Sequence, residues 1–85
     1  MAKRAKQLKY FEIELSNGDD NSAVWMCIRG SDQPTIEEAQ RFLARDSEKF
    51  GLPVAGVYPI DDLTAQSCYD FDNEASWPVF SRAAE

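Results

Sequence analysis

The stretch "YFEIELSNGDDNSAVWMCIR" (residues 10–29) decides the fold, because apolar and polar side chains alternate on both sides of a turn signal. The period of two in residues 10–16 is typical of a half-buried strand, and residues 23–29 provide the return strand. Asn17-Gly18 supplies the positive-φ chemistry of a hairpin turn. The side chains expected to face inward are Phe11, Ile13, Leu15, Val24, Met26 and Ile28. The opposite face receives Tyr10, Glu12, Glu14, Trp25, Cys27 and Arg29.

Residues 35–50 predict an amphipathic helix on one face of this hairpin. Thr35 and Glu38 match a capping box, preceded by Pro34. Gly51 ends the helix and Pro53 prevents it from resuming. The stripe expected against the sheet is Ile36, Ala39, Leu43, Ser47 and Phe50, flanked by Phe42.

The rest of the chain adds a strand, a short helix and a last strand. Pro59 favours an edge position or a strand end for residues 54–60. Asp61 or Asp62 then caps a short helix that runs to about Tyr69. Residues 77–80 have strand composition, with Pro78 favouring an edge or an irregular segment. The order β-β-α-β-α-β predicts an α+β fold: a small antiparallel sheet of three to four strands, one amphipathic helix on one face and a short second helix.

The length of 85 residues indicates one domain, which we place at residues 10–85. Residues 1–9 contain Lys3, Arg4, Lys6 and Lys9 without an acid, and they predict a basic flexible tail, either a solubilising extension or a phosphate-binding one. No apolar run has the length of a membrane span, and the first residues lack a signal-peptide segment, so we expect a cytoplasmic protein. In such a reducing compartment Cys27 and Cys68 are expected as thiols rather than as a disulfide.

The acids are concentrated in the body of the chain, where residues 10–85 carry all fifteen acids against five bases. Such a body should repel nucleic acid and membrane surfaces and be steered toward basic protein surfaces. If residues 70–74 are extended, their alternating acids form an outward row with Phe71 turned inward. The predicted partner-binding acids are Asp61, Asp62, Asp70, Asp72, Glu74, Asp19, Asp20, Glu12 and Glu14. The alternative is an ordinary acidic surface that keeps a small domain soluble.

Trp25 marks a second candidate surface on the outward face of the hairpin. A tryptophan beside Tyr10, rimmed by charge, has the composition of an interface hot spot. If a fourth strand or the short second helix covers this face, Trp25 is instead part of the core. An exposed Trp25 would favour an antitoxin-like or adaptor module that binds a partner through the face of Trp25 and Tyr10.

The sequence offers little for catalysis or for a cofactor. Without histidine there is no Ser-His or Cys-His pair, and two cysteines alone cannot build a four-ligand zinc site. "DFDNE" (residues 70–74) resembles the start of an EF-hand loop, but Ala75 replaces the loop glycine and Ser81 replaces the closing glutamate. We therefore expect no catalytic residues, no metal site and no cofactor; a very small hydrolase with paired carboxylates is the remaining enzyme hypothesis.

The acidic body, the "EIELSNGDD" hairpin (residues 12–20), the single amphipathic helix and the "VAGVYPIDDLTAQSCYDFD" segment (residues 54–72) resemble the small phage-encoded anti-CRISPR proteins. The closest likeness is to those that block type I (Cascade) complexes. These inhibitors share no signature residues, so no role is carried over by position. The resemblance implies a non-enzymatic inhibitor in the bacterial host cell, which binds a basic DNA-handling surface of the effector as a nucleic-acid mimic.

Overall fold

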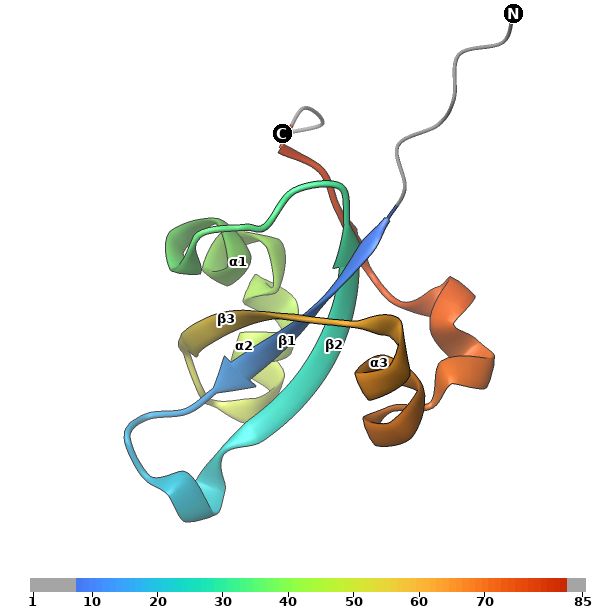
Figure 1. Cartoon of the computed structure of the whole chain (residues 1–85). Helices are drawn as coiled ribbons and strands as arrows, with labels where there is room; N and C mark the ends of the chain where they lie inside the picture. Colours follow the sequence, from blue (N-terminus) through green and yellow to red (C-terminus); the bar gives the residue numbers. More distant parts are fainter. Residues whose placement is uncertain (1–7, 83–85) are drawn as a thin grey trace, which may run out of the picture.

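The computed structural model describes residues 8–82 and shows an α+β fold around a four-stranded sheet with the order β3-β1-β2-β4 (Figure 1). Strands β1 (Lys9–Leu15) and β2 (Val24–Gly30) form an antiparallel hairpin, and β3 (Val54–Ile60) pairs antiparallel with β1. The predicted basic tail falls mostly on residues 1–7, which lie outside the described residues, and β1 already begins at Lys9.

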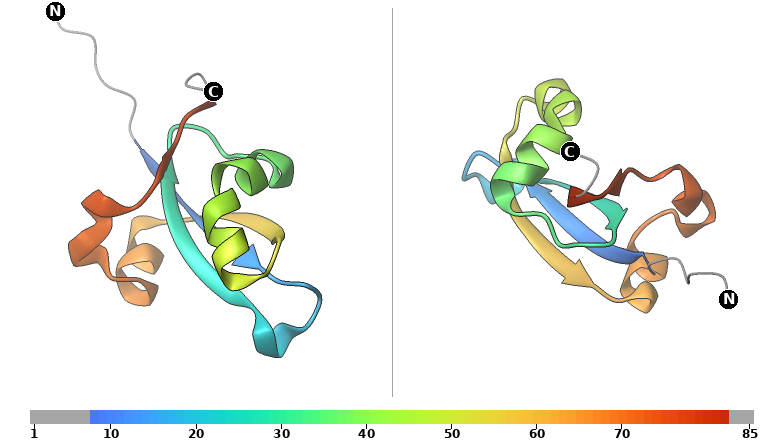
Figure 2. Two further views of the ribbon diagram at one scale, coloured as in Figure 1. Left: turned by 180° about the vertical axis from the view of Figure 1, so that it is seen from behind. Right: turned by 90° about the horizontal axis from the view of Figure 1, so that it is seen from above.

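The last strand corrects the expected all-antiparallel sheet. Strand β4 (Val79–Phe80) runs parallel to β2, pairing Arg29 with Val79 and Gly30 with Phe80. Parallel neighbours need a connection that crosses the sheet. Two such connections exist here: the helices after β2 cross one face to reach β3, and the segment after β3 crosses the opposite face to reach β4 (Figure 2).

The face covered by the first crossing, the inner side, holds the hydrophobic core. Pairing within the hairpin places Phe11 opposite Ile28, Ile13 opposite Met26 and Leu15 opposite Val24, which confirms the predicted inward set. The core is completed by side chains from the helices, β3 and β4, and it consists of Phe11, Ile13, Leu15, Ile28, Ala39, Leu43, Leu52, Val54 and Phe80.

Two helical segments cover the inner side, where a single helix was predicted. The capping box at the start of α1 (Ile36–Phe42) is present, because Thr35 Oγ1 accepts from the Glu38 backbone and Glu38 Oε1 accepts from the Thr35 backbone. At Leu43 the backbone leaves helical geometry (φ −108°, ψ 26°), and α2 (Ala44–Phe50) follows until Gly51, which has left-handed φ.

This break changes the predicted apolar stripe. Ala39, Leu43 and Ser47 are buried, but Ile36 is 49% exposed and Phe50 is 46% exposed. A kinked helix cannot keep one straight stripe against the sheet over its whole length, so the two ends of the stripe turn to solvent.

Ion pairing strengthens the start of α1. Arg82 Nε lies 2.9 Å from Glu38 Oε2, which links the end of the described chain to the capping box. The hydrogen bond from Arg82, followed by the bond from the Thr35 backbone, lowers the pKa of Glu38 to about 2.

The hairpin connection is also longer than the predicted two-residue turn. Residues 16–23 separate the paired ends Leu15 and Val24, and a 3₁₀ turn, η1 (Asp20–Ser22), lies within them. Within this loop, Gly18 is the residue that has a positive φ (103°). The Asp19 carboxylate accepts from the Asn21 backbone and from the Ser22 hydroxyl, so polar side chains stabilise a wider loop in place of a tight turn.

The exposed edge of the sheet at β3 is protected by side chains of the first crossing. Gln33 Nε2 donates to the Val57 carbonyl, and the Val54 backbone N–H donates to Gln40 Oε1 at 2.7 Å. Pro59 has no N–H to offer a further strand. These features confirm the edge position predicted from Pro59 and discourage pairing with another chain.

Candidate interaction surface

The opposite face of the sheet, the outer side, is built from the outward residues of β1, β2 and β3, helix α3 (Asp62–Cys68) and the 3₁₀ segment η2 (Phe71–Ser76). Asp61 is the cap of α3: its Oδ1 accepts from the Thr64 backbone at 2.7 Å, which selects it over Asp62. Hydrogen bonds from the Thr64 side chain and backbone lower the pKa of Asp61. Figures 1 and 2 show α3 and η2 over one end of the sheet, so the outer side has a covered half and an open half.

An aromatic cluster fills the covered half. The Trp77 ring centroid lies 6.0 Å from Tyr10, 6.3 Å from Tyr69 and 5.9 Å from Phe71, each pair close to edge-to-face. Such pairs contribute beyond simple burial. Cys27 and Ala65 are buried on the same side, so the outer side has a small second core of its own.

Tyrosine hydroxyls hold the carboxylates of this side in place. Tyr69 donates to Glu12 Oε2 at 2.6 Å, Tyr10 donates to Glu74 Oε2 at 3.3 Å and Tyr58 donates to Glu14 Oε1 at 3.3 Å. Burial and then the Glu12 carboxylate raise the pKa of Tyr69, while the Glu14 carboxylate raises the pKa of Tyr58. Glu12, Glu14 and Glu74 are thus built into the surface rather than free to swing toward a partner.

Arg29 fixes the acidic segment to the sheet. Its Nη2 donates to the carbonyls of Ala75 (3.1 Å) and Trp77 (3.3 Å), and its Nη1 lies 3.7 Å from Glu74 Oε2. The Arg29 side chain is only 15% exposed. The sequence predicted this arginine on the outward face, among the charges around Trp25. Among the described residues, it is the one basic residue of the outer side.

The expected carboxylate row of residues 70–74 does not form. Residues 71–76 form η2, two short 3₁₀ turns that meet at a kink at Asn73 (φ −106°, ψ 19°), so alternate side chains do not project to one side. Asp70 and Asp72 are exposed, whereas Glu74 is half-buried against Tyr10 and Arg29. Phe71 packs against Tyr10 with ring centroids 5.7 Å apart, which agrees with its predicted inward direction.

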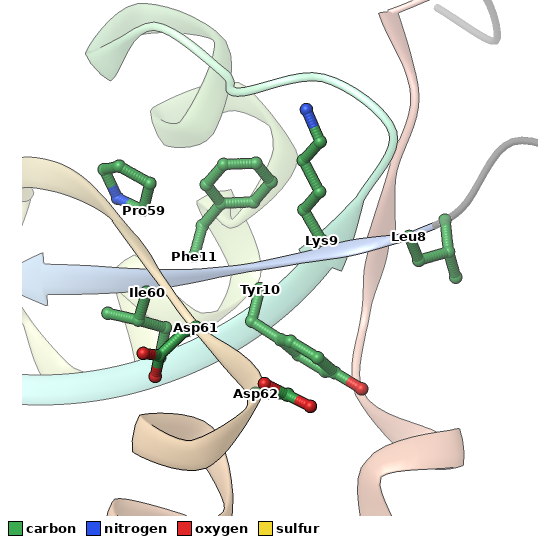
Figure 3. A pocket seen from close by; sticks show the side chains of 8 residues that line it. All are labelled: Leu8, Lys9, Tyr10, Phe11, Pro59, Ile60, Asp61 and Asp62. Carbon is green, nitrogen blue, oxygen red and sulfur yellow. The ribbon is translucent and has the colours of Figure 1, made fainter.

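The remaining predicted acids lie in two other places. Asp19 is exposed in the hairpin loop and Asp20 begins η1, both at the end of the hairpin away from α3. Asp61 and Asp62 lie beside an open hollow of about 470 Å³, where β3 ends (Figure 3). The predicted set is therefore divided among the loop, the hollow, the strands and η2.

Trp25 belongs to the open half and is not part of the core. It is 46% exposed, and its ring centroid lies 6.1 Å from that of Tyr58, which is 45% exposed. Gly56 makes room for this pair: a Cβ there would lie 2.7 Å from Cζ of Tyr58, so a larger residue would make the exposed phenol ring move from its place over the strand. Tyr58 was not among the residues predicted from the sequence, although its spacing of two from Gly56 in β3 places both on this face.

Charge is distributed unevenly between the two sides of the sheet. Residues 8–82 hold fourteen acids and six bases. The outer side carries one base, Arg29, and seven acids: Glu12, Glu14, Asp61, Asp62, Asp70, Asp72 and Glu74. Helices α1 and α2 on the inner side mix four acids with three bases, which are Arg41, Arg45 and Lys49. The outer side is therefore the strongly negative side of the molecule.

Within the described part of the chain, no three or more Asp, Glu or Cys side chains are grouped so that they could hold a metal ion. Cys27 is buried and Cys68 exposed, and both are free thiols. Burial, followed by the Glu12 carboxylate, raises the pKa of Cys27 to about 11. A thiol with such a pKa is almost wholly protonated near neutral pH, so Cys27 is a poor nucleophile.

No helix in residues 8–82 is long and apolar enough to span a membrane. Comparison with protein-family models, curated proteins and solved structures finds no match.

Proposed function

We propose that this chain is a non-enzymatic protein-binding module whose outer side engages a basic protein surface. The observation that supports this proposal is the concentration of seven carboxylates on one side of the sheet, where the one described basic residue is an arginine that is largely buried. Such a surface attracts Lys/Arg-rich partners, accelerates their association and repels nucleic acid.

The fixed positions of several carboxylates favour recognition over a purely solubilising role. Glu12, Glu14 and Glu74 each accept a tyrosine hydroxyl, so a partner meets them with little loss of side-chain entropy. Fixed negative charges of this kind can take the place of phosphates at a nucleic-acid-binding surface. The proposed partner is therefore a protein that handles DNA, and the resemblance to anti-CRISPR proteins makes a type I CRISPR-Cas effector in the bacterial cytoplasm the first to test.

The experiment uses a purified type I effector and labelled target duplex DNA, with DNA binding followed by fluorescence anisotropy. We expect the chain to displace the duplex, and we expect this inhibition to weaken steeply as the salt concentration rises. The variant Asp70→Lys/Asp72→Lys should inhibit at least about tenfold less, since both side chains are exposed on the outer side.

The matched control is Glu37→Lys/Glu48→Lys, which makes the same charge change on exposed residues of α1 and α2. It should inhibit almost as the native chain does. Equal loss in both variants would mean that net charge alone matters, and inhibition unchanged by Asp70→Lys/Asp72→Lys would refute mimicry by this surface.

A second candidate is supported by the exposed aromatic pair of the open half. Trp25 and Tyr58 are large, neighbouring and about half exposed, which is typical of interface anchors in adaptor or antitoxin-like modules. Replacing Trp25 by Ala should then abolish partner binding without unfolding the chain, while Asp70→Lys/Asp72→Lys should retain it. The opposite pattern favours the acidic surface.

A further inference from the structure

The hollow beside Asp61 and Asp62 arises because β3 is shorter than β1 at this end of the sheet. Pairing between the two strands starts at Tyr10 and Ile60, and the chain then turns away into α3. Leu8 and Lys9 continue without a strand on that side. The result is an open notch of about 470 Å³, within the size range of small-ligand sites.

The lining of the notch combines apolar walls with negative charge. Its walls come from Leu8, Tyr10, Phe11, Pro59 and Ile60, and its charged residues are Lys9, Asp61 and Asp62. Figure 3 shows the Asp62 carboxylate and the Tyr10 ring on one side of β1, with Lys9 and Phe11 on the other. The negative part of the notch is therefore separated from Lys9 by the strand.

The two carboxylates differ in how much bonding capacity they have left. Asp61 accepts hydrogen bonds from both the backbone and the side chain of Thr64, so much of its bonding capacity is used. Asp62 is exposed and has no hydrogen bond or ion pair to a described residue, although its charge contributes to raising the pKa of Tyr10 after burial and Glu74. A cationic ligand that enters the notch thus meets unfilled acceptors beside an apolar wall.

A basic side chain combines an apolar stem with a positively charged end, which matches the apolar wall and the carboxylates of the notch. The methylene stem of an arginine can pack along Ile60 and Tyr10 while its guanidinium remains at the carboxylates. The planar fork of N–H donors suits carboxylate oxygens better than an ammonium does. A second copy of this chain is a poor occupant, because residues 8–82 carry a large negative excess in each copy.

We propose that this notch is an arginine-binding site, which receives one arginine side chain of the basic partner between Asp62 and the apolar wall. The proposal rests on the proposed function for its partner class, and it names the chemistry of one contact. It uses Asp62, whereas the test of the proposed function uses Asp70 and Asp72, so the two can fail separately.

The test uses three capped peptides, Gly-Arg-Gly, Gly-Lys-Gly and Gly-citrulline-Gly, titrated into the isotopically labelled full chain and followed by NMR. Citrulline keeps the shape of arginine and lacks its charge. We expect the arginine peptide to shift the amide resonances of Leu8, Ile60 and Asp62, the lysine peptide to do so more weakly and the citrulline peptide not at all.

Substitutions then locate the charge responsible. Asp62→Asn should weaken the arginine peptide about three- to fivefold, as expected for a partly exposed ion pair. Asp72→Asn removes the same charge from the same side but outside the notch, and it should change the affinity little. If both substitutions weaken binding equally, or if citrulline binds as well as arginine, the site does not exist.

The basic residues near the start of the chain are a rival occupant. If the arginine peptide binds only after Lys3, Arg4 and Lys6 are replaced by Ala, this chain fills its own notch and the proposal is wrong. If the peptides never shift the notch while Asp70→Lys/Asp72→Lys still releases the effector, the proposed function stands without an arginine site.

Discussion

The two sides of the central sheet are built from the same strands but have different roles. On β1, Phe11, Ile13 and Leu15 point inward to a core without described charges, whereas Tyr10, Glu12 and Glu14 point outward to a network of tyrosines and carboxylates. Apolar burial dominates the stability of domains of this size. The inner side therefore keeps the chain folded, and the outer side is free to carry charge that would be costly in the core.

The difference also shows where the outer side depends on the inner one. Segment η2 reaches its position because β4 follows it and places Phe80, which is fully buried, in the inner core. The acidic surface is thus anchored at one end by a hydrophobic contact from the other side of the sheet. Four predictions test this division, from the largest expected effect to the smallest.

Phe80→Ala should give the largest loss of stability. Removal of a fully buried phenyl ring, which contacts Phe42 at a centroid distance of 5.5 Å, should lower the free energy of unfolding by about 3–5 kcal/mol. Urea unfolding followed by circular dichroism measures the change. Val79→Ala, at the exposed neighbouring residue of the same strand, is the control and should cost less than about 1 kcal/mol. Similar losses in both variants would contradict the placement of β4.

Arg29→Met tests the anchor of the outer side. The substitution keeps much of the stem, but it leaves the carbonyls of Ala75 and Trp77 without this donor and removes the ion pair with Glu74. We therefore expect a loss of about 2 kcal/mol. Arg45→Met, at an exposed residue of α2, should change stability by about 0.5 kcal/mol or less. Hydrogen exchange should speed up in residues 71–77 and stay unchanged in α1. Uniformly faster exchange would show that Arg29 supports the whole fold rather than this segment.

The role of Arg29 shows which features the sequence could predict and which it could not. Period-two alternation predicted both faces of the hairpin, and local signals predicted the cap at Thr35 and the edge position of Pro59. These features depend on residues close in sequence. The guanidinium of Arg29, in contrast, bonds to carbonyls more than forty residues away. No local pattern reports such a contact.

The same limit explains the errors in the candidate site. An alternating "DFDNE" segment is compatible with a strand, but Arg29 and Tyr10 hold Glu74 from outside the segment and the chain coils into η2. The parallel direction of β4 follows from where the crossing segment ends, which alternation does not specify. Trp25 could be placed on the outward face from sequence, but its exposure depends on how far α3 and η2 extend over that face.

Tyr69→Phe tests how far the outer side contributes to the pH dependence of stability. The raised pKa values of Tyr69 and Cys27 mean that both groups are neutral in the folded state at pH values where the unfolded chain already ionises. Their contribution to stability is therefore complete below about pH 9 and is lost as the pH rises through the folded-state pKa values. Tyr69→Phe should lower stability by about 1 kcal/mol at pH 7 through loss of the bond to Glu12, and it should flatten the alkaline decrease.

Urea midpoints measured from pH 7 to 11 provide this comparison. Tyr58→Phe is the control, because its hydroxyl bonds to Glu14 in the exposed open half. It should leave the midpoint at pH 7 nearly unchanged. Equal alkaline decreases in the native chain and in Tyr69→Phe would contradict a buried tyrosine–glutamate contact in the covered half.

Asp70→Asn/Asp72→Asn should have the smallest effect on stability. Both side chains are exposed, and the Asp70 carboxylate has one described hydrogen bond, from the Asn73 side chain. The free energy of unfolding should therefore stay within about 0.5 kcal/mol of the native value. It should even rise slightly in low salt, because two like charges leave a surface that already repels itself. Thermal unfolding at low and at high salt measures both effects. A clear loss of stability would mean that these acids hold η2 in place and are structural. A neutral or favourable change would mean that folding does not require these acids, so that their role lies at the surface, either in contact with a partner or in keeping the domain soluble.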